Sequence, residues 1–182
     1  THSHAIEVKK LFKVYKGNII AINNIDLNIP HGSIFGLLGP NGAGKTTFIN
    51  ILAGLTSKSS GSVKICGVDI NSNPKTARGA IGVVPQEVNI DPYFTPIEIL
   101  DNQAGYYGIS SKDMQNKTIL RELNLFSKAN AYSRSLSGGM KRRLMIAKAI
   151  VHQPPVLVLD EPTAGVDVEL RKKLWNYRIM IF

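Results

Sequence analysis

An α/β fold is predicted by the order in which apolar segments and glycine-rich turns follow one another along the 182 residues. Residues 34–38 form a short apolar run that ends in a glycine-rich turn, and residues 47–55 then place apolar side chains at helical spacing. Residues 156–159 are apolar and bounded by proline and aspartate, which is typical of a strand buried on both faces. Strand, glycine loop, helix and strand in this order predict an α/β architecture.

The N-terminal part of the chain predicts strands. Apolar residues alternate with polar ones over residues 6–12 and 25–29, as expected for strands with one buried face. Residues 63–66 and 81–84 are short apolar segments and predict two further strands.

The middle of the chain predicts helices instead. Thr95-Pro96-Ile97-Glu98 matches a capping box with proline at the first helical position, so a helix is expected from there to about Tyr107. Residues 111–123 are expected to form a second helix and residues 141–151 a third, which Pro154-Pro155 stops.

The domain organisation follows from these segments. Residues 1–182 are expected to form a single domain, in which residues 91–135 are a helical insert. Residues 168–177 predict a final helix, whereas the last six residues, 177–182, match neither a helix nor a strand clearly.

Composition excludes several classes of protein. Hydrophobic residues make up 43% and charged residues 19%, which excludes a disordered chain, and no apolar run approaches a membrane-spanning length. A single cysteine excludes an internal disulfide framework and is typical of a reducing compartment. The net charge of +9 suits phosphate ligands, nucleic acid or an anionic membrane. Because the basic residues are scattered apart from residues 141–143, solubility and nucleotide steering are the favoured explanations.

The first chemical motif is a phosphate-binding loop. Residues 39–46 match the pattern G-x-x-x-x-G-K-[ST] after an apolar run and before a helix. The glycines let backbone N–H groups turn towards phosphate oxygens, Lys45 is expected to reach the β- and γ-phosphates, and the Thr46 hydroxyl is expected to bind Mg²⁺. The residues expected to bind the nucleotide here are Gly39, Pro40, Asn41, Gly42, Ala43, Gly44, Lys45, Thr46 and Thr47.

Two carboxylates follow the buried strand 156–159. In open α/β sheets this end of the strand is where ligands bind, so Asp160 is expected to hold Mg²⁺ and Glu161 to activate the water that attacks the γ-phosphate. Polar residues that merely end a strand are the alternative, which the phosphate loop in the same chain disfavours.

A second glycine-rich turn precedes the basic helix. Ser137 is a good N-cap, and Gly138 and Gly139 permit close backbone approach, so this helix N-terminus is also suited to an anion. A simple helix cap with flexible glycines is the alternative interpretation.

With these motifs the chain resembles the nucleotide-binding ATPase subunit of ABC transporters. Residues 39–46 resemble the Walker A loop of that family, residues 136–140 its signature loop and residues 156–161 its Walker B strand. The resemblance implies a P-loop NTPase (RecA-like) core with an antiparallel β subdomain and the helical insert.

Three further positions are similar to the family's site. Gln86 resembles the Q-loop glutamine, which implies a catalytic role beside Lys45 and Glu161 and a place at the metal beside Thr46 and Asp160. Residues 164–167 resemble the D-loop, and Tyr15 lies where the family stacks an aromatic ring on adenine. An ordinary packed aromatic, a polar loop residue and a helix cap remain the alternatives for Tyr15, Gln86 and Asp167.

The resemblance also implies cofactors and partners. Residues 102–108 and 138–144 are similar to bacterial exporters of drugs, antibiotics or polysaccharides, whose permease is a separate chain. The implied cofactors are ATP and Mg²⁺, and the implied partners are a transmembrane permease and a second, head-to-tail copy of the chain. The implied location is cytoplasmic and peripheral, on the inner face of the cell membrane, and no nucleic acid is expected.

The chain also departs from the family pattern. Met140 replaces the usual signature glutamine, and no histidine follows His152, so the switch histidine is absent and the chain is expected to be truncated at its C-terminus. The core sheet is then expected to lack a strand and to expose an edge.

Two other functions stay open at this point. A truncated module that binds nucleotide without hydrolysing it is one alternative. A relative that acts on DNA or the ribosome is the other, although no heptad run separates Lys45 from Asp160 and the helical insert lacks a basic-aromatic pattern for RNA.

Overall fold

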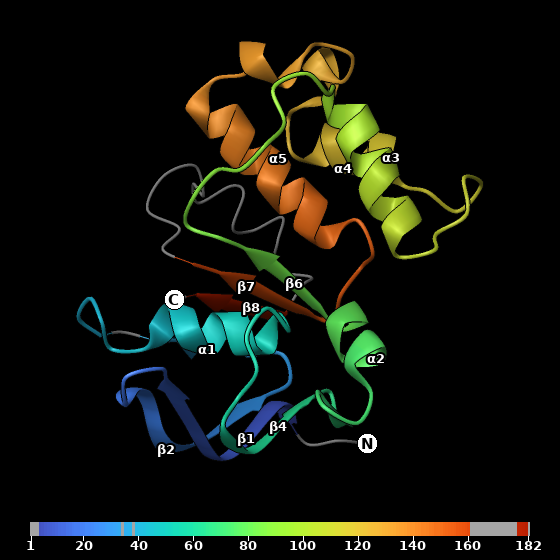
Figure 1. Ribbon diagram of the computed structural model, residues 1–182. Helices are drawn as coiled ribbons and strands as arrows, with labels where there is room; N and C mark the ends of the chain where they lie inside the picture. Colours follow the sequence, from blue (N-terminus) through green and yellow to red (C-terminus); the bar gives the residue numbers. More distant parts are fainter. Residues whose placement is uncertain (1–3, 34, 38, 161–177, 182) are drawn as a thin grey trace. The chain divides into compact units, whose positions relative to one another are not determined.

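The computed structural model describes residues 4–33, 35–37, 39–160 and 178–181 (Figure 1). The chain divides into two compact units. The first contains residues 1–83, 155–160 and 177–182, and the second contains residues 84–154 and 161–176.

An antiparallel sheet forms one part of the first unit. Its strands lie in the order β2-β1-β4-β5, with the long hairpin β1 (His4–Tyr15) and β2 (Ile19–Pro30) followed by β4 (Ser60–Ile65) and β5 (Val68–Asp69). The strands expected over residues 6–12 and 25–29 are confirmed within β1 and β2, and the strand expected over residues 63–66 is confirmed for residues 63–65 of β4. Both strands of the hairpin are longer than the apolar pattern predicted. Their ends extend into exposed residues such as Ile19 and Ile20, because cross-strand hydrogen bonds continue beyond the buried face.

A second sheet has the strand order β3-β8-β7-β6. It is built from β3 (Phe35–Gly36), β6 (Ile81–Val84), β7 (Val156–Leu159) and β8 (Arg178–Ile181). All four residues of β7 are buried, as the sequence predicted for a strand covered on both faces.

The expectation that this sheet lacks a strand is wrong. Residues 178–181 form β8, which runs parallel to β3 on one side and to β7 on the other. Residues 178–181 begin with an arginine and lack the proline and aspartate that bound β7, so their own pattern is weaker. The backbone groups of two neighbouring strands decide their conformation.

Helix α1 (Lys45–Leu52) connects the two sheets of the first unit. Figure 1 shows it between the antiparallel sheet and strands β7 and β8. Phe48 and Ile51 of α1 are buried in one core cluster with Ile6 of β1 and Val158 of β7. The helix starts two residues earlier and ends three earlier than the spacing of apolar residues predicted, and Leu55 is 77% exposed.

One short helix of the first unit carried no clear signal in the sequence. Helix α2 (Pro74–Gly79) buries only Ala77 and starts at a proline after Asn73. Because one buried residue leaves no periodicity, the pattern of apolar residues gave no indication of it.

The second unit is mainly helical. It contains α3 (Pro96–Tyr106), α4 (Asn116–Glu122), α5 (Gly138–Ile150) and the short 3-10 turns η1 (Phe126–Lys128) and η2 (Ser133–Ser135). The predicted capping box is confirmed: Thr95 Oγ1 accepts from the Glu98 N–H, and the Glu98 carboxylate accepts from the Thr95 N–H. The predicted N-cap at Ser137 is confirmed as well, so α5 begins at Gly138.

The helix expected over residues 111–123 is only partly correct. Residues before Asn116 are not helical, because Ser110 and Asp113 form a local turn in which the Ser110 hydroxyl donates to the Asp113 carboxylate at 2.6 Å. Such side-chain hydrogen bonds compete with helix formation. None of the helices in the described part of the chain is long and apolar enough to cross a membrane.

Candidate nucleotide-binding site

The glycine-rich loop between β3 and α1 is held tightly against strand β2. Gly44 caps α1 in a left-handed conformation with φ 88°, and no side chain caps the helix there. A Cβ atom at Gly44 would overlap the backbone oxygen of Ala21, so the position requires glycine. Gly44 has no side chain to accept the first N–H groups of α1, and such groups at a helix N-terminus are suited to an anionic ligand.

Lys45 lies over its own loop. Its Nζ donates hydrogen bonds to the carbonyl oxygens of Gly39 and Pro40, at 2.5 and 3.1 Å. A phosphate oxygen is charged and is therefore a stronger acceptor than a carbonyl, so a bound phosphate would compete for these donors. The contact of Lys45 with the β- and γ-phosphates stays a prediction.

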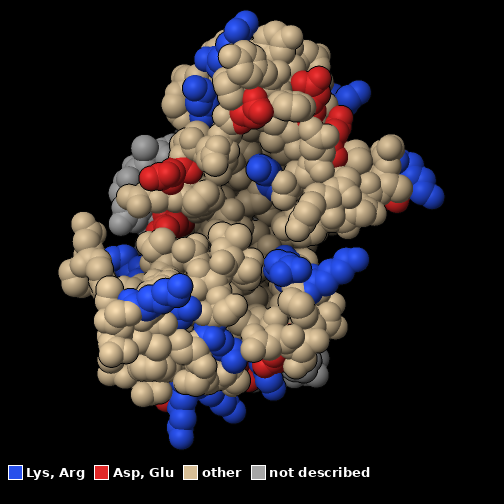
Figure 2. Space-filling view, in the orientation of Figure 1, with Lys and Arg blue, Asp and Glu red and all other residues tan. Residues whose placement is uncertain are grey.

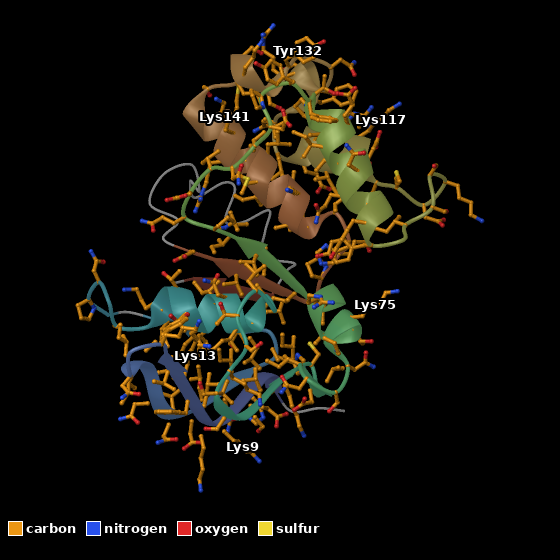
Figure 3. All side chains as sticks on the ribbon, in the orientation of Figure 1. Lys9, Lys13, Lys75, Lys117, Tyr132 and Lys141 are labelled. Carbon is orange, nitrogen blue, oxygen red and sulfur yellow. The ribbon has the colours of Figure 1, made fainter. Side chains whose placement is uncertain are left out.

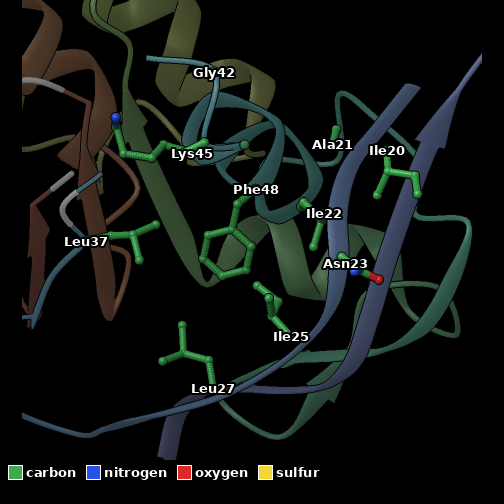
Figure 4. A pocket seen from close by; sticks show the side chains of 12 residues that line it. Ile20, Ala21, Ile22, Asn23, Ile25, Leu27, Leu37, Gly42, Lys45 and Phe48 are labelled. Carbon is green, nitrogen blue, oxygen red and sulfur yellow. The ribbon is translucent and has the colours of Figure 1, made fainter. Parts of the chain in front are cut away.

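A pocket of about 440 Å³ opens beside this loop, on the side of strand β2. Figure 4 shows Phe48 pointing into it between Leu37 and Ile22, with Lys45 along its edge. Its lining side chains are apolar except for Lys45 and Asn23. The apolar lining suits an uncharged part of a ligand, whereas a phosphate group is better suited to the glycine-rich loop.

Tyr15 lies at the end of β1, beside the first turn of α1. Its hydroxyl is 3.4 Å from Thr47 Oγ1, and the residue is 40% exposed. Lys13 places its Nζ 4.7 Å from the centre of the Tyr15 ring and donates to the Ser57 carbonyl oxygen at 2.8 Å. A cation therefore lies against the ring, in a position that sequence reasoning missed because a single lysine in a strand carries no signal.

Basic side chains outnumber acidic ones in the unit that carries this loop. Figure 2 shows lysine and arginine spread over the face of this unit that is in view, and Figure 3 labels Lys9, Lys13 and Lys75 among them. Such an excess attracts an anionic ligand to the surface.

The phosphate loop and Asp160 emerge from the same edge of the second sheet. Ile181 of β8 pairs with Gly36 of β3 and also with Leu159 of β7, so Gly36 and Leu159 lie in one row across the sheet. Asp160 follows Leu159 directly and is only 6% exposed. In parallel sheets this carboxyl edge is where ligands bind.

The oxygen donors at this edge suit Mg²⁺. The Thr46 residue is exposed, and the Asp160 carboxylate is a hard ligand that a divalent cation stabilises when it is buried. Among the described residues no group of three or more His, Cys, Asp or Glu side chains is arranged to hold a metal by itself. A hydroxyl, one carboxylate and phosphate oxygens are the donor set that Mg²⁺ uses with nucleotides.

The second glycine-rich turn starts helix α5 in the other unit. Leu136 is buried, whereas Ser137, Gly138 and Gly139 are exposed. The Ser137 hydroxyl accepts from the Met140 N–H at 3.2 Å. A Cβ atom at Gly138 or Gly139 would meet nothing within 4 Å. The packing of this chain therefore does not require glycine at either position.

Gln86 is exposed in the stretch that follows β6, in the same unit as α5. The guanidinium of Arg142 on α5 donates from Nη1 to the carbonyl oxygens of Pro85 and Gln86, at 2.5 and 3.1 Å. Sequence reasoning missed Arg142, because an arginine within a basic run is normally solvated and this one is 6% exposed.

Several predicted site residues lie outside the described part of the chain. They are Glu161, the D-loop residues 164–167 and the helix expected over residues 168–177. The roles assigned to them rest on the sequence alone.

Domains with such a loop at the carboxyl edge of a parallel sheet form the P-loop class of nucleotide-binding proteins, and this chain has that fold. Within that class, residues 22–164 match the ABC transporter family, to which the chain belongs.

Similar proteins of known sequence are ATP-binding proteins of bacterial exporters. The chain is 44% identical over 173 residues to "Nod factor export ATP-binding protein I" of Cupriavidus pinatubonensis, covering 94% of this chain and 53% of that protein. It is 42% identical over 174 residues to the protein of the same name from Paraburkholderia xenovorans, covering 94% of this chain and 57% of that protein. The chain thus spans about half the length of the curated relatives it matches.

Solved structures have the same fold. An ATP-binding subunit of an ABC transporter matches with a TM-score of 0.84 and 27% identity, over 97% of this chain and 78% of that chain. A dimeric post-hydrolysis state of the ATP-binding cassette MJ0796, bound to ADP and Pi, matches with a TM-score of 0.80 and 29% identity, over 97% of this chain and 86% of that chain.

Proposed function

We propose that the chain is the ATP-binding and ATP-hydrolysing motor of an ABC export system. The observation that carries the proposal is the presence of two exposed glycine-rich helix starts, one at α1 in the first unit and one at α5 in the second. One phosphate loop is enough to bind a nucleotide, and the second helix N-terminus is suited to an anion from outside the chain.

The first helix start and its neighbours are proposed to hold Mg-ATP. Residues 39–47 bind the phosphates, and Tyr15 offers the ring face away from Lys13 to adenine. Thr46, Asp160 and Gln86 hold Mg²⁺, which supplies charge neutralisation to the phosphates when it is bound. Glu161 accepts a proton from the attacking water, and Lys45 stabilises negative charge on the γ-phosphate.

The second helix start is proposed to bind the ATP of another copy of this chain. Ser137, Gly138 and Gly139 are exposed, and the openness around both glycines leaves their backbone accessible to a phosphate from outside the chain. Two copies then face head to tail with each ATP between residues 39–46 of one copy and residues 137–139 of the other.

Dimerisation tests this arrangement. The Glu161→Gln variant is expected to become a dimer in sedimentation velocity with saturating Mg-ATP and to stay a monomer without nucleotide. A matched Glu161→Gln, Lys45→Ala double variant is expected to remain a monomer in both conditions. A monomer at saturating Mg-ATP under every condition would exclude the head-to-tail arrangement.

The helical unit is proposed to bind a transmembrane permease. Residues 91–135 form the proposed insert, and a pocket of about 350 Å³ on this unit is lined by Asn102, Tyr106 and Lys148 among others. Export as the direction of transport is proposed from the name of the relatives, together with a peripheral location on the inner face of the membrane and no nucleic-acid partner.

Crosslinking to the permease tests that surface. In a Cys66→Ser background, Asn102→Cys is expected to crosslink to the permease, whereas Lys117→Cys on α4 is the exposed control. Equal crosslinking at both positions would contradict the proposed surface.

Hydrolysis tests the motor itself. Steady-state Mg-ATP turnover by the 182-residue chain is expected, and it should fall at least a hundredfold in Glu161→Gln. ATP binding without turnover in either protein would instead favour the hydrolytically silent module.

A further inference from the structure

The buried guanidinium of Arg142 connects the two loops of the helical unit that are proposed to serve the nucleotide. Arg142 lies in the second turn of α5, four residues after Gly138. Its Nη1 donates to the carbonyl oxygens of Pro85 and Gln86. Both of these acceptors belong to an exposed stretch, whereas Arg142 is 6% exposed. A buried group thus anchors a surface loop.

A buried guanidinium is costly unless its donors are used. Removing a cation from water costs several kcal/mol, and hydrogen bonds to the charged group must offset this cost. An apolar side chain at this position would avoid the cost altogether. The neighbouring Lys141 is partly exposed on the same helix, so basic character alone does not require burial (Figure 3).

A second set of hydrogen bonds joins the same two segments at their other ends. Ser133, which is fully buried, donates to the Phe94 carbonyl oxygen from its backbone N–H at 2.9 Å and from its hydroxyl at 2.7 Å. The Arg134 N–H donates to the Pro92 carbonyl oxygen at 3.2 Å. Residues 85–94 are therefore bonded to residues 133–142 at both ends.

The Ser137 turn lies between the two sets of bonds. It follows Ser133 and Arg134 in the chain, and Arg142 follows it on the rigid first turns of α5. A displacement of the turn therefore moves donors on both sides of it, and each of these donors is bonded to residues 85–94.

We propose that Arg142 is a positioning residue that makes Gln86 and the Ser137–Gly139 turn move as one body. The inference rests on the proposed function, in which Gln86 serves the ATP of its own copy and the turn binds the ATP of the other. Docking of the turn on a partner's phosphate then brings Gln86 along with it, and release of the turn withdraws Gln86.

Amide hydrogen exchange tests the anchoring without any need for turnover. In Arg142→Met, the backbone amides of Ser133 and Arg134, which donate to the Phe94 and Pro92 carbonyl oxygens, are expected to exchange about tenfold faster than in the parent chain, while the amides of β7 keep their rates. Arg142→Lys keeps the charge and a donor and is expected to restore most of the protection. Lys141→Met is the matched control and is expected to change nothing. Unchanged exchange at Ser133 and Arg134 in Arg142→Met would overturn the proposal.

A double-mutant cycle tests whether Arg142 acts through Gln86. Arg142→Met is expected to lower kcat for Mg-ATP hydrolysis about tenfold with little change in KM, and to lower it no further in a Gln86→Ala background. If the decreases in kcat from the two substitutions multiply in the double variant, the two residues act independently, and the proposed role of Arg142 would be overturned. Absence of turnover in the parent chain would instead refute the proposed function, and the exchange comparison would still decide the anchoring.

Discussion

The N-termini of α1 and α5 are both rich in glycine, but the fold requires glycine at only one of them. At α1, Gly44 has a left-handed backbone and no room for a Cβ atom beside Ala21, so the fold of this chain requires it. At α5, Gly138 and Gly139 have open space around them, and Ser137 caps the helix. The fold therefore leaves these two glycines open to a contact from outside the chain, which the proposed function assigns to the ATP of a second copy.

The largest expected effect comes from a substitution at the N-terminus of α1. Gly44→Ala combines a left-handed backbone with overlap on Ala21, so we expect the melting temperature to fall by several degrees and ATP binding to be lost. Calorimetric melting and ATP titration measure both. Gly79→Ala at the end of α2 is the control, because its Cβ atom meets nothing within 4 Å and its melting temperature should not fall.

The next largest effect distinguishes the role of the α5 N-terminus from that of the α1 N-terminus. Gly138→Ala is expected to leave the melting temperature and ATP affinity of the isolated chain unchanged, because the added methyl group meets no atom of this chain. In the Glu161→Gln background it should weaken ATP-dependent dimerisation at least tenfold, as measured by sedimentation. A fall in ATP affinity of the monomer would show that the turn serves its own copy.

A smaller effect comes from the cap of α5. Ser137→Ala removes the acceptor of the Met140 N–H and should lower the free energy of unfolding by about 1 kcal/mol. Ser137→Thr retains a hydroxyl and should recover most of the loss in chemical denaturation. Equal losses in the two variants would mean that the hydrogen bond does not stabilise the helix.

The smallest effect concerns α3, a helix start with no proposed ligand. Its capping box lowers the pKa of Glu98 below the usual value, because the N–H and the hydroxyl of Thr95 both donate to the carboxylate. The stabilisation by the ionised Glu98 is therefore present above its unfolded pKa and is lost as the pH falls through the folded pKa.

Thr95→Ala should therefore raise the pKa of Glu98 towards its usual value in an NMR titration of the carboxyl carbon. Thr118→Ala on the exposed face of α4 is the control. A Glu98 pKa that stays low in Thr95→Ala would attribute the shift to the helix terminus alone.

Local signals in the sequence were sufficient where neighbouring residues decide the structure. Thr95 with Glu98, the Ser137 cap and the four apolar residues of β7 each predicted their element correctly. The phosphate loop was found for the same reason, since its glycines and Lys45 are contiguous in the chain.

Contacts between distant residues explain what the sequence did not predict. Strand β8 is defined by pairing with β3 and β7, and Arg142 is buried by the stretch that follows β6. Lys13 lies against Tyr15 because both side chains are on the same face at the end of one strand. The alternation of apolar and polar residues does not predict this contact. For β8 and Arg142 the partner lies outside the window that a sequence pattern covers, whereas Lys13 and Tyr15 are two residues apart.

Strand β8 also has a consequence for the order in which the sheet is assembled. Strand β3, which leads into the phosphate loop, gains its β8 neighbour through pairs such as Phe35 with Met180. A ribosome makes Phe35 long before Met180, and closing so long a loop slows the pairing further. During synthesis the nascent chain therefore holds a phosphate loop whose strand lacks this neighbour until residue 181 has emerged.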